Sequence, residues 1–123
     1  MKRLAVAVLL LMAGCSDAAP SSEATVELRE FAVDVSASSW RSEGTTVSVR
    51  NTGEFGHTLL VTSAAGDVVG SVDLLAPGAS TTLSLDLPPG AYELTCRIVV
   101  GLPDGTTVDH YEAGMSTGID VAG

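Results

Sequence analysis

The sequence has little basic charge and only two cysteines. Its 123 residues include six Lys and Arg against fifteen Asp and Glu. Lys2 and Arg3 stand at the start, so the rest of the chain holds four Arg, no Lys and all fifteen acids, a formal charge of −11. Such a surface repels the phosphates of nucleic acids and anionic lipid headgroups, so a nucleic-acid partner is not expected. The charge serves solubility, or it steers the chain toward a basic partner.

Long apolar runs are also missing, except near the N-terminus. Leu4 to Met12 is an unbroken apolar run, too short to span a bilayer as a helix but suited to a secretory signal. With the basic start and the following Ala13-Gly14-Cys15, it resembles a bacterial lipobox, in which the cysteine is lipidated. An ordinary signal peptide with an incidental cysteine is the alternative. We expect a lipoprotein signal peptide at 1–14, a lipidated Cys15 with a flexible tether at 15–24, and a folded domain at 25–123.

The lipobox resemblance also implies where the protein is found. It implies secretion across the inner membrane and a lipid anchor in a bacterial membrane, on its periplasmic or extracellular face. The sequence does not distinguish between inner-membrane and outer-membrane sorting.

Helical periodicity is missing from the rest of the chain. Short segments rich in Val, Thr and Leu are separated by turn sequences such as Asn51-Thr52-Gly53 and Pro88-Pro89-Gly90. Seven to eight such segments predict an all-β fold, a Greek-key β-sandwich. The predicted strands are Thr25–Val35 with a slip near Phe31, Thr45–Arg50, His57–Thr62, Val68–Leu74, Ser80–Leu87, Ala91–Val100 and Thr117–Val121.

The scarcity of cysteine draws attention to Cys96. If Cys15 is lipidated, Cys96 is the only thiol of the domain. A lone thiol in an oxidising compartment is a liability unless it is buried or bound to a metal. Two imidazoles, His57 and His110, and the thioether of Met115 are further donors of the kind that copper prefers. Each also has an ordinary interpretation, as a buried apolar thiol, surface histidines and a core methionine.

Thirteen residues separate Cys96 from His110, but a turn lies midway. Residues 101–105, Gly-Leu-Pro-Asp-Gly, are a strong turn sequence between two β-prone segments. A hairpin centred near Pro103-Asp104 returns His110 to the neighbourhood of Cys96. Whether both side chains face the same way depends on the loop length, because a slip of one residue reverses the face. A glycine before Met115 lets the loop bend toward the same centre.

These segments resemble the cupredoxins, a family of type-1 (blue) copper proteins. Residues 44–53 and 57–61 are similar to the segment with the family's first His ligand, 75–80 and 87–96 to the approach to the Cys ligand, and 110–115 and 119–121 to the His–Met loop and last strand. The resemblance implies a cupredoxin-like sandwich with one type-1 copper ion held by His57, Cys96, His110 and Met115. Two features depart from the family pattern. Compact members have only a few residues between the Cys and the second His, and Thr58 stands where the family often has Asn.

The function that this resemblance implies is electron transfer by a membrane-tethered copper protein, with another redox protein as its partner. A copper-handling or storage lipoprotein and a metal-free cupredoxin-like binding module are the alternatives. Zinc could use the same ligands, but a thioether suits copper better. We expect a monomer and no enzymatic activity, since the sequence has no Gly-x-Ser-x-Gly nucleophile elbow of a hydrolase.

Overall fold

The computed structural model describes residues 19–123, which form eleven β-strands and no helix. The all-β prediction is therefore confirmed for this part of the chain. The signal peptide and the lipidated Cys15 were predicted within residues 1–18 and lie outside the described range. No helix among residues 19–123 is long and apolar enough to cross a membrane. The strands are β1 Glu23–Arg29, β2 Ala32–Val35, β3 Ser39–Arg41, β4 Thr45–Asn51, β5 His57–Ser63, β6 Val68–Leu75, β7 Ser80–Leu85, β8 Gly90–Thr95, β9 Val99–Gly101, β10 Thr107–Asp109 and β11 Ser116–Ala122.

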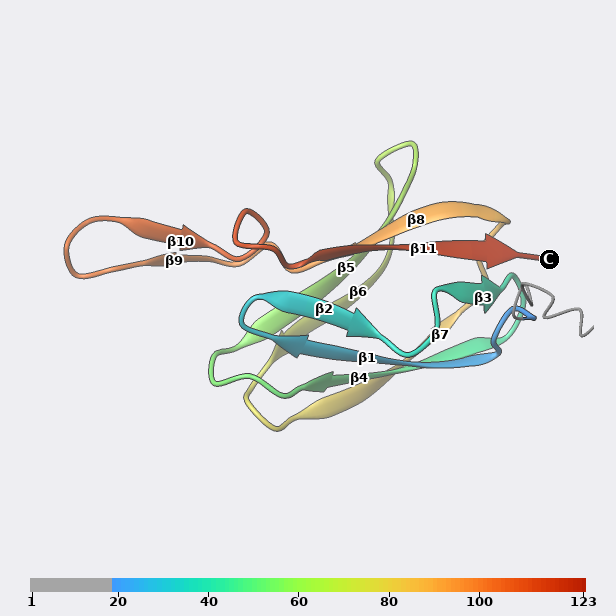
Figure 1. The fold of residues 1–123 in the computed structure, drawn as a ribbon, viewed down its shortest axis with the longest axis horizontal. Coiled ribbons are helices and arrows are strands. Elements are labelled where there is room, and N and C mark those ends of the chain that lie inside the picture. The colour runs from blue at the N-terminus through green and yellow to red at the C-terminus, as the bar shows by residue number, and fades with distance from the viewer. Residues whose placement is uncertain (1–18) are drawn as a thin grey trace, which may run out of the picture.

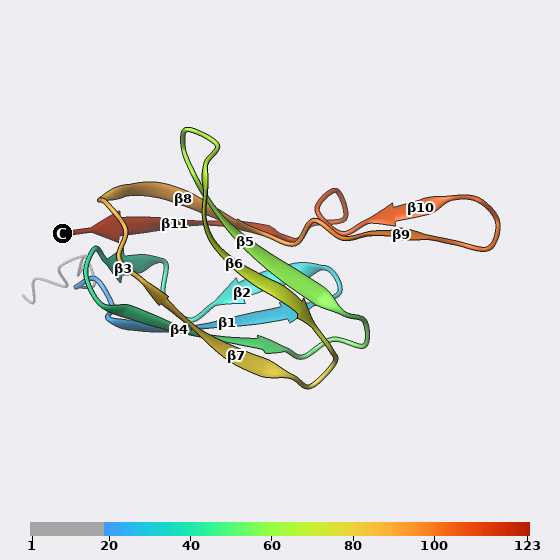
Figure 2. The same ribbon diagram turned by 180° about the vertical axis from the view of Figure 1, so that it is seen from behind.

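The strands form two packed sheets and a separate hairpin (Figures 1 and 2). One sheet has the order β2-β1-β4-β7, and the other has the order β3-β11-β8-β5-β6. The chain crosses between the sheets after β2, β3, β4, β6 and β7, so most neighbours within a sheet are not consecutive in sequence. This connectivity is that of a Greek-key sandwich, as the strand pattern predicts.

The core lies between the two sheets. In β1 and β4 every second side chain is buried, which is the period of a strand with one face in the core. The apolar ones among these side chains belong to one cluster with those of β5, β8 and β11. Trp40, in the short strand β3, is fully buried, and its indole N–H donates to the carbonyl of Ala37 at 2.8 Å. The core thus holds both sheets firmly and fixes the ends of their strands.

The structure divides two of the predicted strands and also contains the short strands β3 and β10, so its strands outnumber the seven to eight predicted. The segment Thr25–Val35 forms two antiparallel strands, β1 and β2, joined by a tight turn at Glu30 and Phe31. The slip in alternation near Phe31 marks this turn. The segment Ala91–Val100 is also divided, because β8 ends before the ladder of the hairpin begins with β9.

The hairpin of β9 and β10 projects from one end of the sandwich (Figure 1). Its register pairs Gly101 with Thr107, so its centre falls at Asp104, as predicted. The N–H of His110 donates to the carbonyl of Ile98 at 2.9 Å, which extends the pairing to the base of the hairpin. His110 is therefore returned to the end of β8, where the sequence pattern places it.

Candidate metal centre

Three potential metal ligands meet at the end of the sandwich from which the hairpin projects. His57 opens β5, Cys96 follows β8 and His110 follows β10. The start of β5 and the end of β8 lie at the same end of the sheet, because these neighbouring strands are antiparallel. One donor atom from each side chain lies within 4.8 Å of the others, and all three residues are buried. The structure thus brings together three of the four predicted ligand side chains.

The distances between the donor atoms suit a metal ion. Cys96 Sγ lies 3.6 Å from His110 Nδ1 and 3.9 Å from His57 Nδ1. An ion about 2.0–2.3 Å from each donor holds nitrogen and sulfur donors about 3.6–3.8 Å apart at angles between tetrahedral and trigonal. The side chains therefore need only small movements to bind an ion. One thiolate and two imidazoles form a donor set that fits copper.

The sulfur of Cys96 receives contacts from Thr58, the residue after the first histidine. The Thr58 N–H donates to Sγ at 3.5 Å, and the Thr58 hydroxyl lies 3.7 Å from the same atom. Hydrogen bonds to the sulfur of a ligating cysteine influence the redox potential of a bound metal. Thr58 lacks the amide that is common at this position of the cupredoxins, but its hydroxyl does reach the cysteine.

Met115 is fully buried, and its backbone lies beside the cluster. The N–H of Cys96 donates to the Met115 carbonyl at 3.2 Å, and the N–H of Met115 donates to the His110 carbonyl at 3.0 Å. Gly114 has a φ of +127°, and a Cβ there would lie 3.0 Å from the carbonyl oxygen of Phe31. The glycine therefore allows the bend that was predicted before Met115. Axial coordination by the thioether remains a prediction.

His57 is held from behind by Glu30, a residue that the sequence pattern did not reveal. Its Nε2 lies 2.9 Å from Glu30 Oε1. Burial raises the pKa of Glu30, but hydrogen bonds from the backbone N–H groups of Phe55 and Glu54, and from His57, lower it to about 2. The ionised carboxylate can only accept, so Nε2 of His57 carries a proton. In the neutral ring, Nδ1 then presents its lone pair toward Cys96.

Asn51 shapes the loop that leads to His57. Its side chain is fully buried, and its Nδ2 donates to the carbonyls of Phe55 at 2.7 Å and Leu75 at 2.9 Å. Its Oδ1 accepts from the N–H of Gly53 at 2.9 Å. The contact of Oδ1 with Gly53 closes an Asx turn at the start of the loop, and the contact of Nδ2 with Phe55 holds its end. The pattern Asn-x-Gly could have indicated this role, but it was interpreted only as a strand break.

His110 is covered by an aromatic ring. The rings of Phe31 and His110 meet edge to face with centroids 5.3 Å apart, and the rings of the two histidines lie 5.1 Å apart. Burial and the nearby His57 lower the pKa of His110, against the opposing effects of Glu30 and Asp109. A neutral imidazole keeps its lone pair free, so it can bind a metal without first losing a proton.

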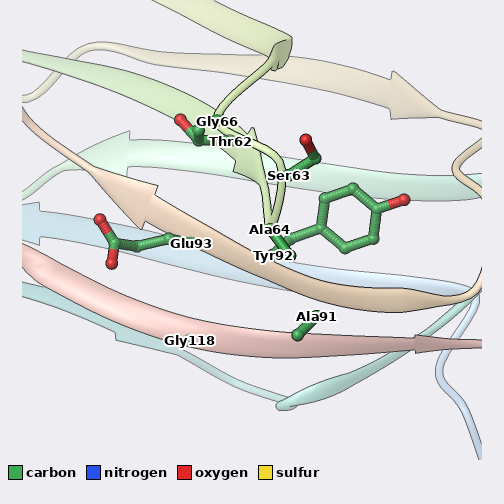
Figure 3. Close-up of a pocket in the computed structure, with 8 residues that line it drawn as sticks. All are labelled: Thr62, Ser63, Ala64, Gly66, Ala91, Tyr92, Glu93 and Gly118. Atoms are coloured by element: carbon green, nitrogen blue, oxygen red, sulfur yellow. The ribbon is translucent and has the colours of Figure 1, made fainter.

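A surface pocket of about 370 Å³ lies at the far end of β5 from His57 (Figure 3). None of its lining residues is His or Cys, and the Tyr92 hydroxyl donates to the carbonyl of Pro88 at 2.6 Å. The pocket therefore offers no second set of soft metal ligands. It is lined by Thr62, Ser63, Ala64, Gly66, Ala91, Tyr92, Glu93 and Gly118.

Comparison with solved structures identifies the fold. Auracyanin from Roseiflexus castenholzii matches 85% of this chain and 100% of its own, with 20% identity and a TM-score of 0.62. A purple cupredoxin from Nitrosopumilus maritimus matches 80% of this chain and 98% of its own, with 14% identity and a TM-score of 0.51. Rusticyanin matches 81% of this chain and 78% of its own, with 18% identity and a TM-score of 0.51. No protein-family model and no curated protein sequence matches the chain.

The chain therefore has the cupredoxin fold, which it shares with these three solved structures. The resemblance inferred from the sequence is confirmed at this level. Within the fold, the cluster of His57, Cys96 and His110 is typical of a type-1 copper site.

Proposed function

We propose that this protein is an electron carrier that binds one type-1 copper ion through His57, Cys96, His110 and Met115. The observation that carries the proposal is the buried His-Cys-His cluster, with its Sγ–Nδ1 distances of 3.6 and 3.9 Å. A bound copper ion would supply a centre that alternates between the cuprous and cupric states. Auracyanin and rusticyanin were each solved in a reduced form, so the fold is compatible with redox chemistry in those proteins.

The protein's own residues supply a rigid and dry environment. The ligands lie at the ends of packed strands, and the buried amide of Asn51 fixes the loop before His57. Thr58 holds the sulfur of Cys96, and Phe31 covers His110. Preorganised ligands change little in position when the charge at the centre changes, and this keeps the cost of electron transfer low.

The proposal extends to the location of the domain. A lipid on Cys15 would tether it to a bacterial membrane on the periplasmic or extracellular face, where another redox protein is the partner. Cys15→Ser should then move the protein from the membrane fraction to the soluble fraction. Membrane association that persists in this variant would contradict the anchor, without affecting the copper proposal.

The direct test is to add Cu(II) to the metal-free protein, with Cys96 as a free thiol, and record its optical spectrum. The wild type should develop an intense thiolate-to-copper band, and Cys96→Ser should not. Strong Cu(I) binding without a cupric band would favour copper handling or storage instead. A protein that retains no copper, with a melting temperature unmoved by it, would favour a metal-free binding module, since binding to the native state raises stability.

A further inference from the structure

We propose that Glu30 is a positioning residue that fixes His57 and lowers the reduction potential of the bound copper. The inference rests on the proposed function and adds a residue outside the four predicted ligands. Glu30 lies in the turn between β1 and β2, in the sheet opposite to that of His57. Its carboxylate contacts Nε2 of His57, whereas the other ring nitrogen, Nδ1, is the one that lies near Cys96.

The carboxylate is built into its place by several donors. Oε1 lies 2.9 Å from His57 Nε2 and accepts from the N–H of Phe55 at 2.8 Å. The N–H of Glu54 lies 3.0 and 3.1 Å from the two carboxylate oxygens. The Glu30 side chain is only 21% exposed, and that of His57 is 0% exposed. These donors hold the carboxylate against the ring and prevent it from turning freely into solvent.

Gly53 provides the space that this arrangement requires. A Cβ at Gly53 would lie 2.5 Å from Glu30 Oε1 and 2.6 Å from Oε2, so any larger residue there would displace the carboxylate from its contact with His57. The N–H of Gly53 is itself held by Asn51 Oδ1 at 2.9 Å. The loop between β4 and β5 is therefore shaped around the Glu30 carboxylate, in addition to carrying His57 to its position.

This contact has two chemical consequences. Because the carboxylate accepts a hydrogen bond from the Nε2–H of His57, Nδ1 is the ring nitrogen that can present a lone pair to the metal. A carboxylate behind a ligating imidazole also makes the ring a stronger donor and places a negative charge near the metal. Both effects favour the more positive cupric state, so they lower the reduction potential.

The neighbouring Glu54 offers a matched control. Glu54 lies in the loop between β4 and β5, and its side chain is exposed. It contacts Glu30 through its backbone N–H and not through its carboxylate. Glu54→Gln removes the same formal charge as Glu30→Gln without touching His57. A glutamine at position 30 keeps the size of the glutamate side chain and one oxygen that can accept a hydrogen bond from His57. The two variants therefore separate the effect of a charge in contact with the His57 ring from that of an exposed charge in the neighbouring loop.

The experiment uses the full-length chain, solubilised in detergent and loaded with copper, and measures the reduction potential of wild type, Glu30→Gln and Glu54→Gln. Glu30→Gln should shift the Cu(II)/Cu(I) ratio at a fixed applied potential about tenfold toward Cu(I), a rise of about 59 mV. Glu54→Gln should shift it less than about twofold, because an exposed charge is screened. Equal shifts in the two variants, or no shift in Glu30→Gln, would overturn the inference while leaving the copper site intact.

A second measurement does not need copper. Nitrogen-15 NMR of the metal-free protein at neutral pH reports which ring nitrogen of His57 carries the proton. The wild type should show the Nε2–H form alone, and Glu30→Ala should show a mixture. A proton on Nδ1 in the wild type, or the same single form in both proteins, would contradict the positioning role. If the wild type binds no copper, the proposed function fails, and this measurement still decides the role of Glu30.

Discussion

At the scale of single residues, this centre differs from an open metal site because both of its histidines are buried. His57 is 0% exposed and His110 is 2% exposed, so neither imidazole presents an edge to solvent. The ring of Phe31 packs against that of His110, and the Phe31 residue is itself 38% exposed. We therefore expect Phe31 to control how easily small molecules reach the metal.

Phe31→Ala tests this control. An edge-to-face aromatic contact is worth about 0.5–1.5 kcal/mol. If removing copper from the site requires breaking this contact, its loss should speed that removal about 2- to 10-fold. The measurement is the rate at which a chelator takes copper from the loaded protein. Phe55→Ala is the control, because Phe55 is 59% exposed in the adjacent loop. Equal rates in both variants would show that Phe31 is no barrier.

At the scale of secondary-structure elements, the hairpin of β9 and β10 determines whether His110 joins the site. The Ile98–His110 hydrogen bond belongs to the register that pairs Val100 with Val108. Side chains in a strand alternate between faces, so a change of one residue on one side of the hairpin would reverse the side to which His110 points. Adding or removing one residue on each of the two strands would leave that side unchanged.

Two deletions distinguish these cases. Removing Ile98 alone, which lies between Cys96 and the hairpin ladder, should reverse the side to which His110 points. Copper binding should then weaken by more than about 100-fold, which exceeds the usual loss when a residue that only orients a ligand is removed. Removing the cross-strand pair Val100 and Val108 shortens the hairpin but preserves the register at its base, so copper affinity should change less than about threefold. Competitive copper titration measures both. Equal losses would show that hairpin length, rather than register, places His110.

The same hairpin shows what could be predicted from the sequence. The Pro-Asp-Gly turn and its β-prone flanks are local features, so they are enough to predict the centre of the hairpin and the return of His110 toward Cys96.

The sequence predicts the other side of the site less well. The turn at Glu30 and Phe31 resembles a slip within one strand, because a bulge and a tight turn disturb the alternation in similar ways. The contact of Glu30 with His57 joins residues 27 positions apart on different sheets, and no local pattern indicates it.

At the scale of the whole molecule, the dominant property is negative charge. Fifteen acidic residues face six basic ones in the full chain, a net charge of −9. A field of this sign raises the local concentration of cations and repels anions at low salt. The end of the domain with the candidate metal centre contributes to this field through Glu54 in the loop before β5 and Glu112 after His110, both exposed.

Salt dependence of electron transfer tests whether this field acts on partners. The rate of electron exchange between the copper-loaded protein and a cationic metal complex should fall as ionic strength rises from about 0.01 to 0.15 M, because the screening length shrinks from about 30 to 8 Å. The rate with an anionic complex of similar size should rise. If both rates change in the same direction, the charge serves solubility and does not steer electron transfer.

The central claim is that His57, Cys96 and His110 hold one copper ion, and X-ray absorption at the copper edge tests it most directly. The loaded wild type should show one sulfur and two imidazole nitrogens at about 2.0–2.3 Å. Cys96→Ser should lose the short sulfur contact. A spectrum of the wild type with only oxygen and nitrogen neighbours, or with fewer than two imidazoles, would contradict the account.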